Sequence, residues 1–118
     1  MKNTTVAYGE ILLRLTPSTH GDLIDQSSSL NISFAGAESN ILSNLSNLGH
    51  NATMISSLPN NSLGKSAIRF LRSFGLNTDF IEINQGRIGT FFIEHGLSSR
   101  ASQVIYDRID SCFSKTKI

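Results

Sequence analysis

The sequence predicts an α/β fold in which a partial parallel sheet with flanking helices is joined by a small antiparallel β flap. Three observations support this prediction. Apolar, strand-like stretches alternate with two segments of helical periodicity, which is typical of strand–helix–strand units with parallel strands. A glycine directly follows each helical segment, as expected at the carboxyl end of a helix. Near the end of the chain, two strand-like stretches flank a short polar loop, which indicates a hairpin.

The composition limits the classes of protein to which the chain can belong. Its 118 residues suffice for one domain. The net charge of +1 comes from basic and acidic residues scattered along the chain, without the basic stripe of a nucleic-acid-binding protein. The sequence shows neither an apolar run of about 20 residues that would span a membrane nor an apolar signal peptide. We therefore expect a cytoplasmic protein that binds neither nucleic acid nor membrane.

The single cysteine and the three histidines show no sign of disulfide or metal chemistry. Cys112 alone excludes an internal disulfide framework, and we expect it to be a small buried residue. His20 and His95 each precede a glycine in a predicted turn, and His50 follows a predicted helix end. None of them has metal-ligand spacing with another ligand residue, so no metal site is predicted.

The first part of the chain is predicted to form two strands and a helix. The stretch VAYGEILLRL (residues 6–15) is predicted as one strand, because its apolar residues are at first nearly continuous and later alternate. After a polar loop, NISF (residues 31–34) is predicted as a second, short strand. Residues 38–48 are predicted as a helix that ends at Gly49, because four apolar residues fall on one arc of roughly 120°. These are Ile41, Leu42, Leu45 and Leu48.

The middle of the chain repeats the alternation of strand and helix. ATMISSL (residues 52–58) is β-rich and is closed by Pro59. A second amphipathic helix follows and stops at Gly75, with Lys65, Arg69, Arg72 and Ser73 on its polar face. Its apolar face comprises Leu63, Ala67, Phe70, Leu71 and Phe74.

The last part of the chain is predicted to be mainly strands. TDFIEI, RIGTFFIE and QVIYDR (residues 78–83, 87–94 and 103–108) are strand-like, and the last two are joined by the hairpin loop HGLSSRAS. A parallel sheet of only three or four strands leaves an unpaired edge and an uncovered face. We therefore expect that the fold is incomplete within these 118 residues.

The stretch LPNNSLGKS (residues 58–66) is a candidate phosphate-binding loop. It follows a strand, opens a helix and ends in Gly64-Lys65-Ser66, as a P-loop does. However, Pro59 stands where that pattern has a glycine, and proline fixes φ and has no N–H. The favoured interpretation is a plain helix start with Lys65 exposed. A small P-loop-like nucleotide binder that uses Lys65 and Ser66 is kept as an alternative.

The stretch FAGAESN (residues 34–40) connects a predicted strand to a predicted helix and has two interpretations. Gly36 has no Cβ, so a sugar hydroxyl or a phosphate can approach its backbone closely. The first turn of the helix offers free N–H groups for an anion, and Asn40 can both donate to and accept from a hydroxyl. The alternative is a simple turn in which Glu38 is favourable at the positive end of the helix dipole. The residues alone leave both open.

Tyr106 and Arg108 form a further candidate pair. They stand two apart in a predicted strand and therefore point to one face. A guanidinium can bind a carboxylate with two hydrogen bonds, so an arginine beside a tyrosine hydroxyl suits a sugar acid.

Taken together, these segments resemble the amino-terminal part of the PfkB (ribokinase-like) family of carbohydrate kinases. The resemblance rests on Ala35-Gly36-Ala37, Asn40 and Ser43, Leu48-Gly49, and the glycine in LPNNSLG. Within the family, GEILLRL, GAESN, GRIGTFFIE and VIYDR are similar to the branch that phosphorylates 2-keto-3-deoxygluconate. The resemblance covers residues 6–111 and implies an incomplete ribokinase-like fold.

The resemblance implies that the loop before the helix holds sugar hydroxyls rather than nucleotide phosphates. It assigns the following residues to substrate binding, and none to catalysis or to a metal: Gly36, Ala37, Asn40, Phe91, Tyr106 and Arg108. Arg14 is a seventh candidate, because many relatives carry there an aspartate that would repel an acidic sugar. The flap would serve as a lid over the sugar and as a contact surface for a homodimer.

The resemblance also implies what this chain lacks. Residues 1–118 would be the amino-terminal substrate-binding and lid portion of a kinase that transfers the γ-phosphate of ATP to a sugar acid such as 2-keto-3-deoxygluconate. ATP and Mg²⁺ would bind the carboxy-terminal half, which also carries the aspartate base and the anion hole on which phosphoryl transfer depends. We therefore expect the isolated chain to be inactive and to bind neither cofactor. A non-catalytic sugar-binding or dimerisation module remains a second alternative.

Overall fold

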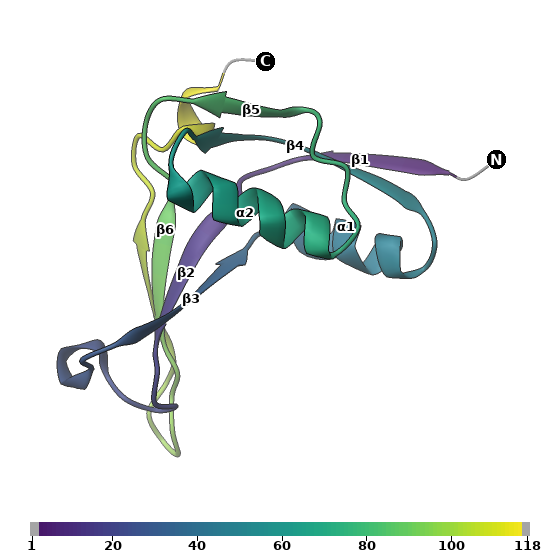
Figure 1. Cartoon of the computed structure of the whole chain (residues 1–118). Coiled ribbons are helices and arrows are strands. Elements are labelled where there is room, and N and C mark those ends of the chain that lie inside the picture. The colour runs from purple at the N-terminus through teal and green to yellow at the C-terminus, as the bar shows by residue number, and fades with distance from the viewer. Residues whose placement is uncertain (1–2, 117–118) are drawn as a thin grey trace.

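The computed structural model describes residues 3–116, which form seven strands and two α-helices (Figure 1). Their bounds in chain order are β1 Thr4–Tyr8, β2 Leu12–Pro17, β3 Leu30–Ala35, α1 Ala37–Asn47, β4 Asn51–Pro59, α2 Ser62–Ser73, β5 Ile81–Asn84, β6 Thr90–Glu94 and β7 Gln103–Asp107. Short 3₁₀ helices, η1 Ile24–Gln26 and η2 Phe113–Lys115, lie in the β2–β3 connection and after β7. Neither α-helix in this described part is long and apolar enough to cross a membrane.

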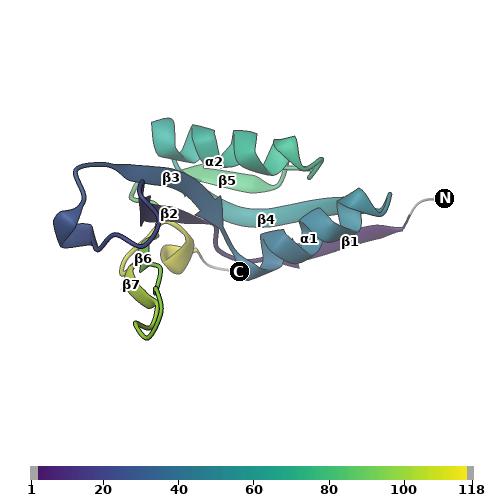
Figure 2. The ribbon, with the colours of Figure 1, turned by 90° about the horizontal axis from the view of Figure 1, so that it is seen from below.

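The strands form two sheets, which confirms the predicted α/β fold with parallel and antiparallel parts. The base sheet is parallel and has the order β1-β4-β5. The lid sheet has the order β3-β2-β6-β7 and extends away from the helices (Figure 1). Figure 2 shows β6 and β7 projecting on the side of the base sheet opposite α2. This projection explains why the radius of gyration, 15.6 Å, exceeds the roughly 13.5 Å of a compact domain of this length.

The core lies between the base sheet and the two helices. Ala52, Met54 and Leu58 project from one face of β4, because they are separated by even numbers of residues. They pack in one cluster with Leu42 of α1 and Leu71 of α2. The predicted helix stops are confirmed, since the glycines after α1 and α2 adopt the left-handed backbone that favours glycine.

The prediction of one strand over residues 6–15 is wrong. The chain leaves the base sheet after Tyr8, crosses through residues 9–11 and enters the lid sheet at Leu12. The apolar pattern continues through the crossing because Ile11 is buried in the core at this point. Periodicity therefore gave no sign that the stretch belongs to two sheets.

The flap is larger than the predicted hairpin. The hairpin of β6 and β7 is confirmed, and its register pairs Phe91 with Tyr106. However, β6 also pairs in parallel with β2, and β2 pairs with β3. The predicted second strand, residues 31–34, therefore belongs to the lid sheet rather than to the parallel sheet.

The apolar face predicted for α1 is only partly correct. Leu42 is fully buried, but Ile41 and Leu48 are 59% and 75% exposed. Ser39 is buried instead, because its hydroxyl donates to the carbonyl oxygen of Gly36 at 3.0 Å. Because the hydroxyl of such a serine is hydrogen-bonded to the backbone at the start of its own helix, the side chain can be buried without the free-energy cost of an unpaired polar group.

Two predicted strands begin later than expected. The stretch 78–83 first makes a turn, in which the side chain of Asn77 accepts from the N–H of Asp79 at 3.0 Å, so β5 begins at Ile81. β6 begins at Thr90, although the carbonyl oxygen of Gly89 before it already accepts from the N–H of Leu13 in β2 at 2.8 Å. In the first case a local side-chain contact forms a turn in place of the predicted start of the strand.

Cys112 is buried, as predicted, with its sulfur 3.4 Å from the carbonyl oxygen of Gln85. Burial raises the pKa of its thiol, so the reactive thiolate becomes scarcer in the folded chain at any given pH. We expect iodoacetamide to alkylate Cys112 at pH 8 at least about tenfold more slowly in the folded chain than in urea. The folded rate should still rise at pH values where an exposed cysteine has already reached its plateau. Equal rates with and without urea would contradict the buried position.

Candidate functional site

A cavity of about 370 Å³ lies where the base sheet meets the lid sheet. Tyr8, at the carboxyl end of β1, contributes one wall, and Gly36, Ala37 and Glu38 at the start of α1 contribute another. The remaining lining residues come from the crossing, from the start of β2, from β7 and from the segment after it: Gly9, Glu10, Leu12, Tyr106, Arg108 and Phe113. Ligands of open α/β sheets bind at the carboxyl ends of the strands, which is where this cavity lies.

A half-buried ion pair closes one side of the cavity. Glu10 stands in the crossing between the sheets, and its side chain is only 7% exposed. Arg108, just after β7, donates from Nη2 to Glu10 Oε1 at 2.5 Å, and Ser111 donates from Oγ to Oε2 at 2.7 Å. The Arg108 side chain remains 46% exposed, so its guanidinium is available to a ligand in the cavity.

Two glycines make room for Glu10. A Cβ on Gly36 would lie 2.5 Å from the carbonyl oxygen of Glu10, and one on Gly89 would lie 2.5 Å from its Oε2. The backbone of Gly36 is extended, a conformation that any residue adopts, so the reason for glycine here is the close approach of Glu10. In this structure the need for glycine at position 36 comes from a packing contact at the edge of the cavity, and the approach of a sugar to its backbone stays a prediction.

The structure brings four of the seven predicted substrate-binding residues together around the cavity: Gly36, Ala37, Tyr106 and Arg108. The first two stand at the start of α1, and the other two stand at the end of β7. The chain is folded so that segments about 70 residues apart face each other across the cavity.

The other three predicted residues lie near the cavity but do not line it. Phe91 is the neighbour of Tyr106 across the lid sheet, with ring centroids 5.9 Å apart. Arg14 is in turn the β2 neighbour of Phe91, so Arg14, Phe91 and Tyr106 share one face of the lid sheet. Asn40 is exposed on α1, one turn beyond Gly36.

Sequence reasoning missed several residues of the site. Glu10 gave a signal, since it is a lone carboxylate inside the apolar run VAYGEILL, where a charge needs a partner. Glu38 was considered only as a helix-start residue, although it also lines the cavity. Tyr8 and Phe113 gave no signal, because only the fold places their rings 5.0 Å apart at the cavity wall.

The arrangement suits a small polyol whose one carboxylate lies at Arg108, because the lining carries this one guanidinium and two carboxylates, Glu10 and Glu38. The guanidinium of Arg108 and the amino-terminal end of α1 both favour negative charge. Glu38 offers an acceptor for hydroxyl groups, and Tyr8 and Tyr106 offer flat walls that carry hydroxyls. The cavity volume lies in the range of small-molecule sites.

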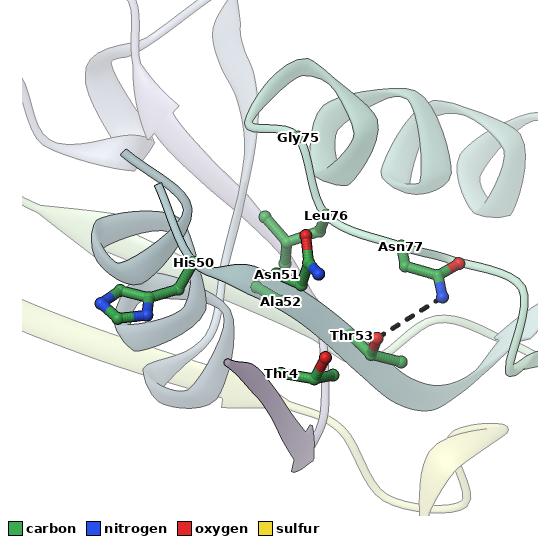
Figure 3. Close-up of a pocket in the computed structure, with 8 residues that line it drawn as sticks. All are labelled: Thr4, His50, Asn51, Ala52, Thr53, Gly75, Leu76 and Asn77. Atoms are coloured by element: carbon green, nitrogen blue, oxygen red, sulfur yellow. Dashed lines mark hydrogen bonds between the residues drawn. The ribbon is translucent and has the colours of Figure 1, made fainter. Parts of the chain in front are cut away.

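A second cavity, of about 360 Å³, lies at the amino ends of β1 and β4 (Figure 3). Its lining includes Thr4, Asn51, Thr53 and Asn77, and the Asn77 amide donates to Thr53 Oγ1 at 3.4 Å. In Figure 3 the His50 ring points away from these residues, so among the described lining residues no ionisable side chain converges on the space. This cavity lies at the wrong end of the strands for an α/β ligand site.

The described residues 3–116 contain no group of three or more His, Cys, Asp or Glu side chains that is placed to hold a metal ion.

The start of α2 does not resemble a phosphate-binding loop. The Asn61 side chain accepts from the N–H of Gly64 at 3.1 Å, and a Cβ on Gly64 would lie 2.0 Å from the carbonyl oxygen of Pro59. The residues that resemble a P-loop thus serve as a helix cap and a close contact between α2 and β4.

Replacing Lys65 by alanine is expected to leave the response of the chain to ATP unchanged. Lys65 is exposed on α2, so the free energy of unfolding should also change by less than about 0.5 kcal/mol. Thermal melts of both chains with and without Mg-ATP provide the measurement. Arg69→Ala, one turn later on the same exposed face, is the control. An ATP-induced shift that Lys65→Ala alone removes would support the P-loop alternative.

Comparison with known proteins identifies relatives over almost the whole chain. A family model described as pfkB family carbohydrate kinase matches residues 2–117. A 2-dehydro-3-deoxygalactonokinase of Haloferax volcanii is 36% identical over 112 residues, which are 95% of this chain and 35% of that enzyme.

Two solved structures show the same arrangement. The crystal structure of 2-dehydro-3-deoxygluconokinase from Thermotoga maritima has a TM-score of 0.93 and 43% identity, over 98% of this chain and 35% of that one. A PfkB family carbohydrate kinase from Listeria grayi has a TM-score of 0.91 and 36% identity, over 98% of this chain and 36% of that one. The chain therefore spans about a third of the length of these relatives.

Proposed function

The chain belongs to the pfkB family of carbohydrate kinases, and on this premise we propose that it forms the sugar-acid-binding part of a 2-keto-3-deoxy sugar acid kinase. The observation that carries the proposal is the cavity in which Arg108, the start of α1 and Glu38 meet. The named relatives, a 2-dehydro-3-deoxygluconokinase and a 2-dehydro-3-deoxygalactonokinase, act on acids of this class, which supports it further.

In the proposed complex, Arg108 binds the substrate carboxylate and the first turn of α1 faces its hydroxyl groups. Gly36 and Ala37 present their backbone to the sugar, and Glu38 accepts hydroxyl hydrogen bonds. Tyr106, which is 62% exposed, closes over the ligand from the lid sheet. Asn40 on α1 and Phe91 and Arg14 on the lid sheet complete the set from beyond the cavity wall, and the last two would reach the sugar when the lid moves toward it.

We propose that phosphoryl transfer requires a part of the kinase that this chain does not span. The described residues offer neither a phosphate cradle at α2 nor a metal-ligand cluster, so ATP and Mg²⁺ would bind elsewhere in the complete kinase. Residues 1–118 on their own would bind the sugar acid without phosphorylating it. The complete enzyme would act in the cytoplasm, where its nucleotide substrate is.

Titration with 2-keto-3-deoxygluconate, followed by NMR of the labelled chain, tests the binding part of the proposal. We expect shifts at the amides of residues 36–38 and 106–108, and none around the cavity of Figure 3. Fusion to the remaining two thirds of the Thermotoga maritima enzyme tests the kinase part. ATP-dependent phosphorylation by the fusion is the expected result, and a folded fusion without it would contradict the proposal.

The lid sheet also supports the predicted homodimer. Ile32, Leu15, Phe92 and Ile105 lie in register across the four strands and form an apolar strip, whose outer members are 64% and 49% exposed. Replacing Ile105 by lysine is expected to convert a dimer to a monomer in light-scattering measurements, because the charge would be buried in the interface. Leu48→Lys, at the exposed end of α1, is the control. Firm dimerisation without sugar binding would favour the interaction-module alternative.

A further inference from the structure

Glu10 lies at the junction between the two sheets and bonds to two distant parts of the chain. It lies in the crossing by which the chain enters the lid sheet, whereas Arg108 and Ser111 lie in the segment by which the chain leaves it. One buried carboxylate therefore joins the entry and the exit of the lid sheet through two hydrogen bonds of 2.5 and 2.7 Å. In the sequence, Arg108 lies 98 residues and Ser111 lies 101 residues from Glu10.

The side chains of Glu10 and Arg108 differ in their exposure to solvent. The Glu10 side chain is 7% exposed, but that of Arg108 is 46% exposed and lines the cavity. A guanidinium has five N–H donors in a rigid plane. The hydrogen bond from Nη2 to Glu10 Oε1 holds one corner of this plane and so restricts the directions of the other donors. The Arg108 carbon Cζ lies 5.8 Å from the centre of the Tyr106 ring, which limits its movement on another side.

We propose that Glu10 is a positioning residue, which holds the Arg108 guanidinium so that its free N–H groups face the carboxylate of the substrate. This proposal rests on the proposed function, because it requires that an acidic sugar enters the cavity. Glu10 itself touches no substrate in this scheme. Ser111 contributes to the same positioning, because its hydroxyl donates a hydrogen bond to the second carboxylate oxygen of Glu10.

The test compares 2-keto-3-deoxygluconate with its primary amide, which has the same shape but no charge. Calorimetry gives the dissociation constants of both ligands for the wild-type chain and for Glu10→Ala. We expect Glu10→Ala to weaken binding of the acid by about tenfold or more, the worth of one hydrogen bond to a charged group, and to change binding of the amide far less. Removing a negative charge near the cavity would by itself strengthen binding of an anion, so a loss cannot have that cause.

Two further variants make the result decisive. Ser111→Ala leaves all charges in place and should lower the preference for the acid in the same direction by about threefold, less than Glu10→Ala because Ser111 acts on Arg108 only through the Glu10 carboxylate. If Glu10→Ala does not fold, the comparison of acid and amide binding by Ser111→Ala still tests the proposal. Asp107→Asn, which affects only the exposed pair with Arg87, should retain the wild-type preference.

The outcomes separate this proposal from the proposed function. If the acid and the amide are weakened equally in Glu10→Ala and Ser111→Ala, Glu10 is a brace for the fold and the positioning role is overturned. An unchanged or increased affinity for the acid in Glu10→Ala overturns it as well. If the wild-type chain binds neither ligand, the proposed function fails first, and the positioning role fails with it.

Discussion

Replacing Leu42 by alanine is expected to lower the free energy of unfolding by about 2–5 kcal/mol, the usual range for a buried leucine. Leu42 is completely buried between α1 and β4, in the same cluster as Met54 and Leu71. Domains of this size have about 5–15 kcal/mol of stability in total, so the loss would populate the unfolded chain at modest temperatures. Urea denaturation followed by circular dichroism measures the change.

Ile41 provides a matched control, because it is the preceding residue on the same helix and is 59% exposed. Ile41→Ala should change the free energy of unfolding by less than about 0.5 kcal/mol, as for most surface substitutions. The sequence pattern placed both residues on one apolar face and so predicts similar losses. Equal losses would therefore contradict the packing of α1 described above.

Replacing Arg108 by glutamine is expected to weaken binding of 2-keto-3-deoxygluconate by about 10- to 100-fold, because hydrogen bonds to charged groups contribute about 1.5–3 kcal/mol. The same change leaves the buried Glu10 carboxylate without its cationic partner. Removing one partner of a fully buried pair costs about 3–5 kcal/mol. Arg108 is half-exposed and water can replace part of the contact, so we expect a smaller loss than this range. Calorimetry and urea denaturation give the two quantities.

Arg87→Gln is the matched control for Arg108→Gln. Arg87 pairs with Asp107 at 2.9 Å, but the two side chains are 43% and 57% exposed, and neither lines the cavity. An exposed ion pair contributes about 0–1 kcal/mol, and its loss should leave sugar-acid binding unchanged. If both substitutions weaken binding to the same extent, the effect is one of overall positive charge and Arg108 has no specific role.

Most elements of the fold were predictable because they depend on local patterns. The two helices, their glycine stops, the strand β4 and the β6–β7 hairpin each have a period or a turn signal of their own. Two of the errors arose where a tertiary contact replaced the local pattern. The break after Tyr8 follows from a change of sheet, and the exposure of Ile41 follows from the direction in which α1 meets the base sheet.

The candidate site was predictable in part, for a similar reason. Gly36, Tyr106 and Arg108 were identified by their type and by resemblance to the family, and all three line the cavity. The resemblance did not rank the candidate residues by importance. It also named Asn40 and Arg14, which do not line the cavity. Glu10 was missed because a carboxylate in an apolar run shows only that a partner exists, and the partner lies 98 residues away.

By itself, the sequence determined the alternation of strands and helices, the α/β class and the family, because periodicity and short motifs are properties of neighbouring residues. Only the tertiary structure decided which strands form the base sheet and which form the lid sheet, and that Glu10 binds Arg108 and Ser111 where the two sheets meet. These features join segments that are distant in the chain. The Glu10 contacts in addition require the burial of a charge beside a cavity, and no local pattern encodes which residues will be its partners.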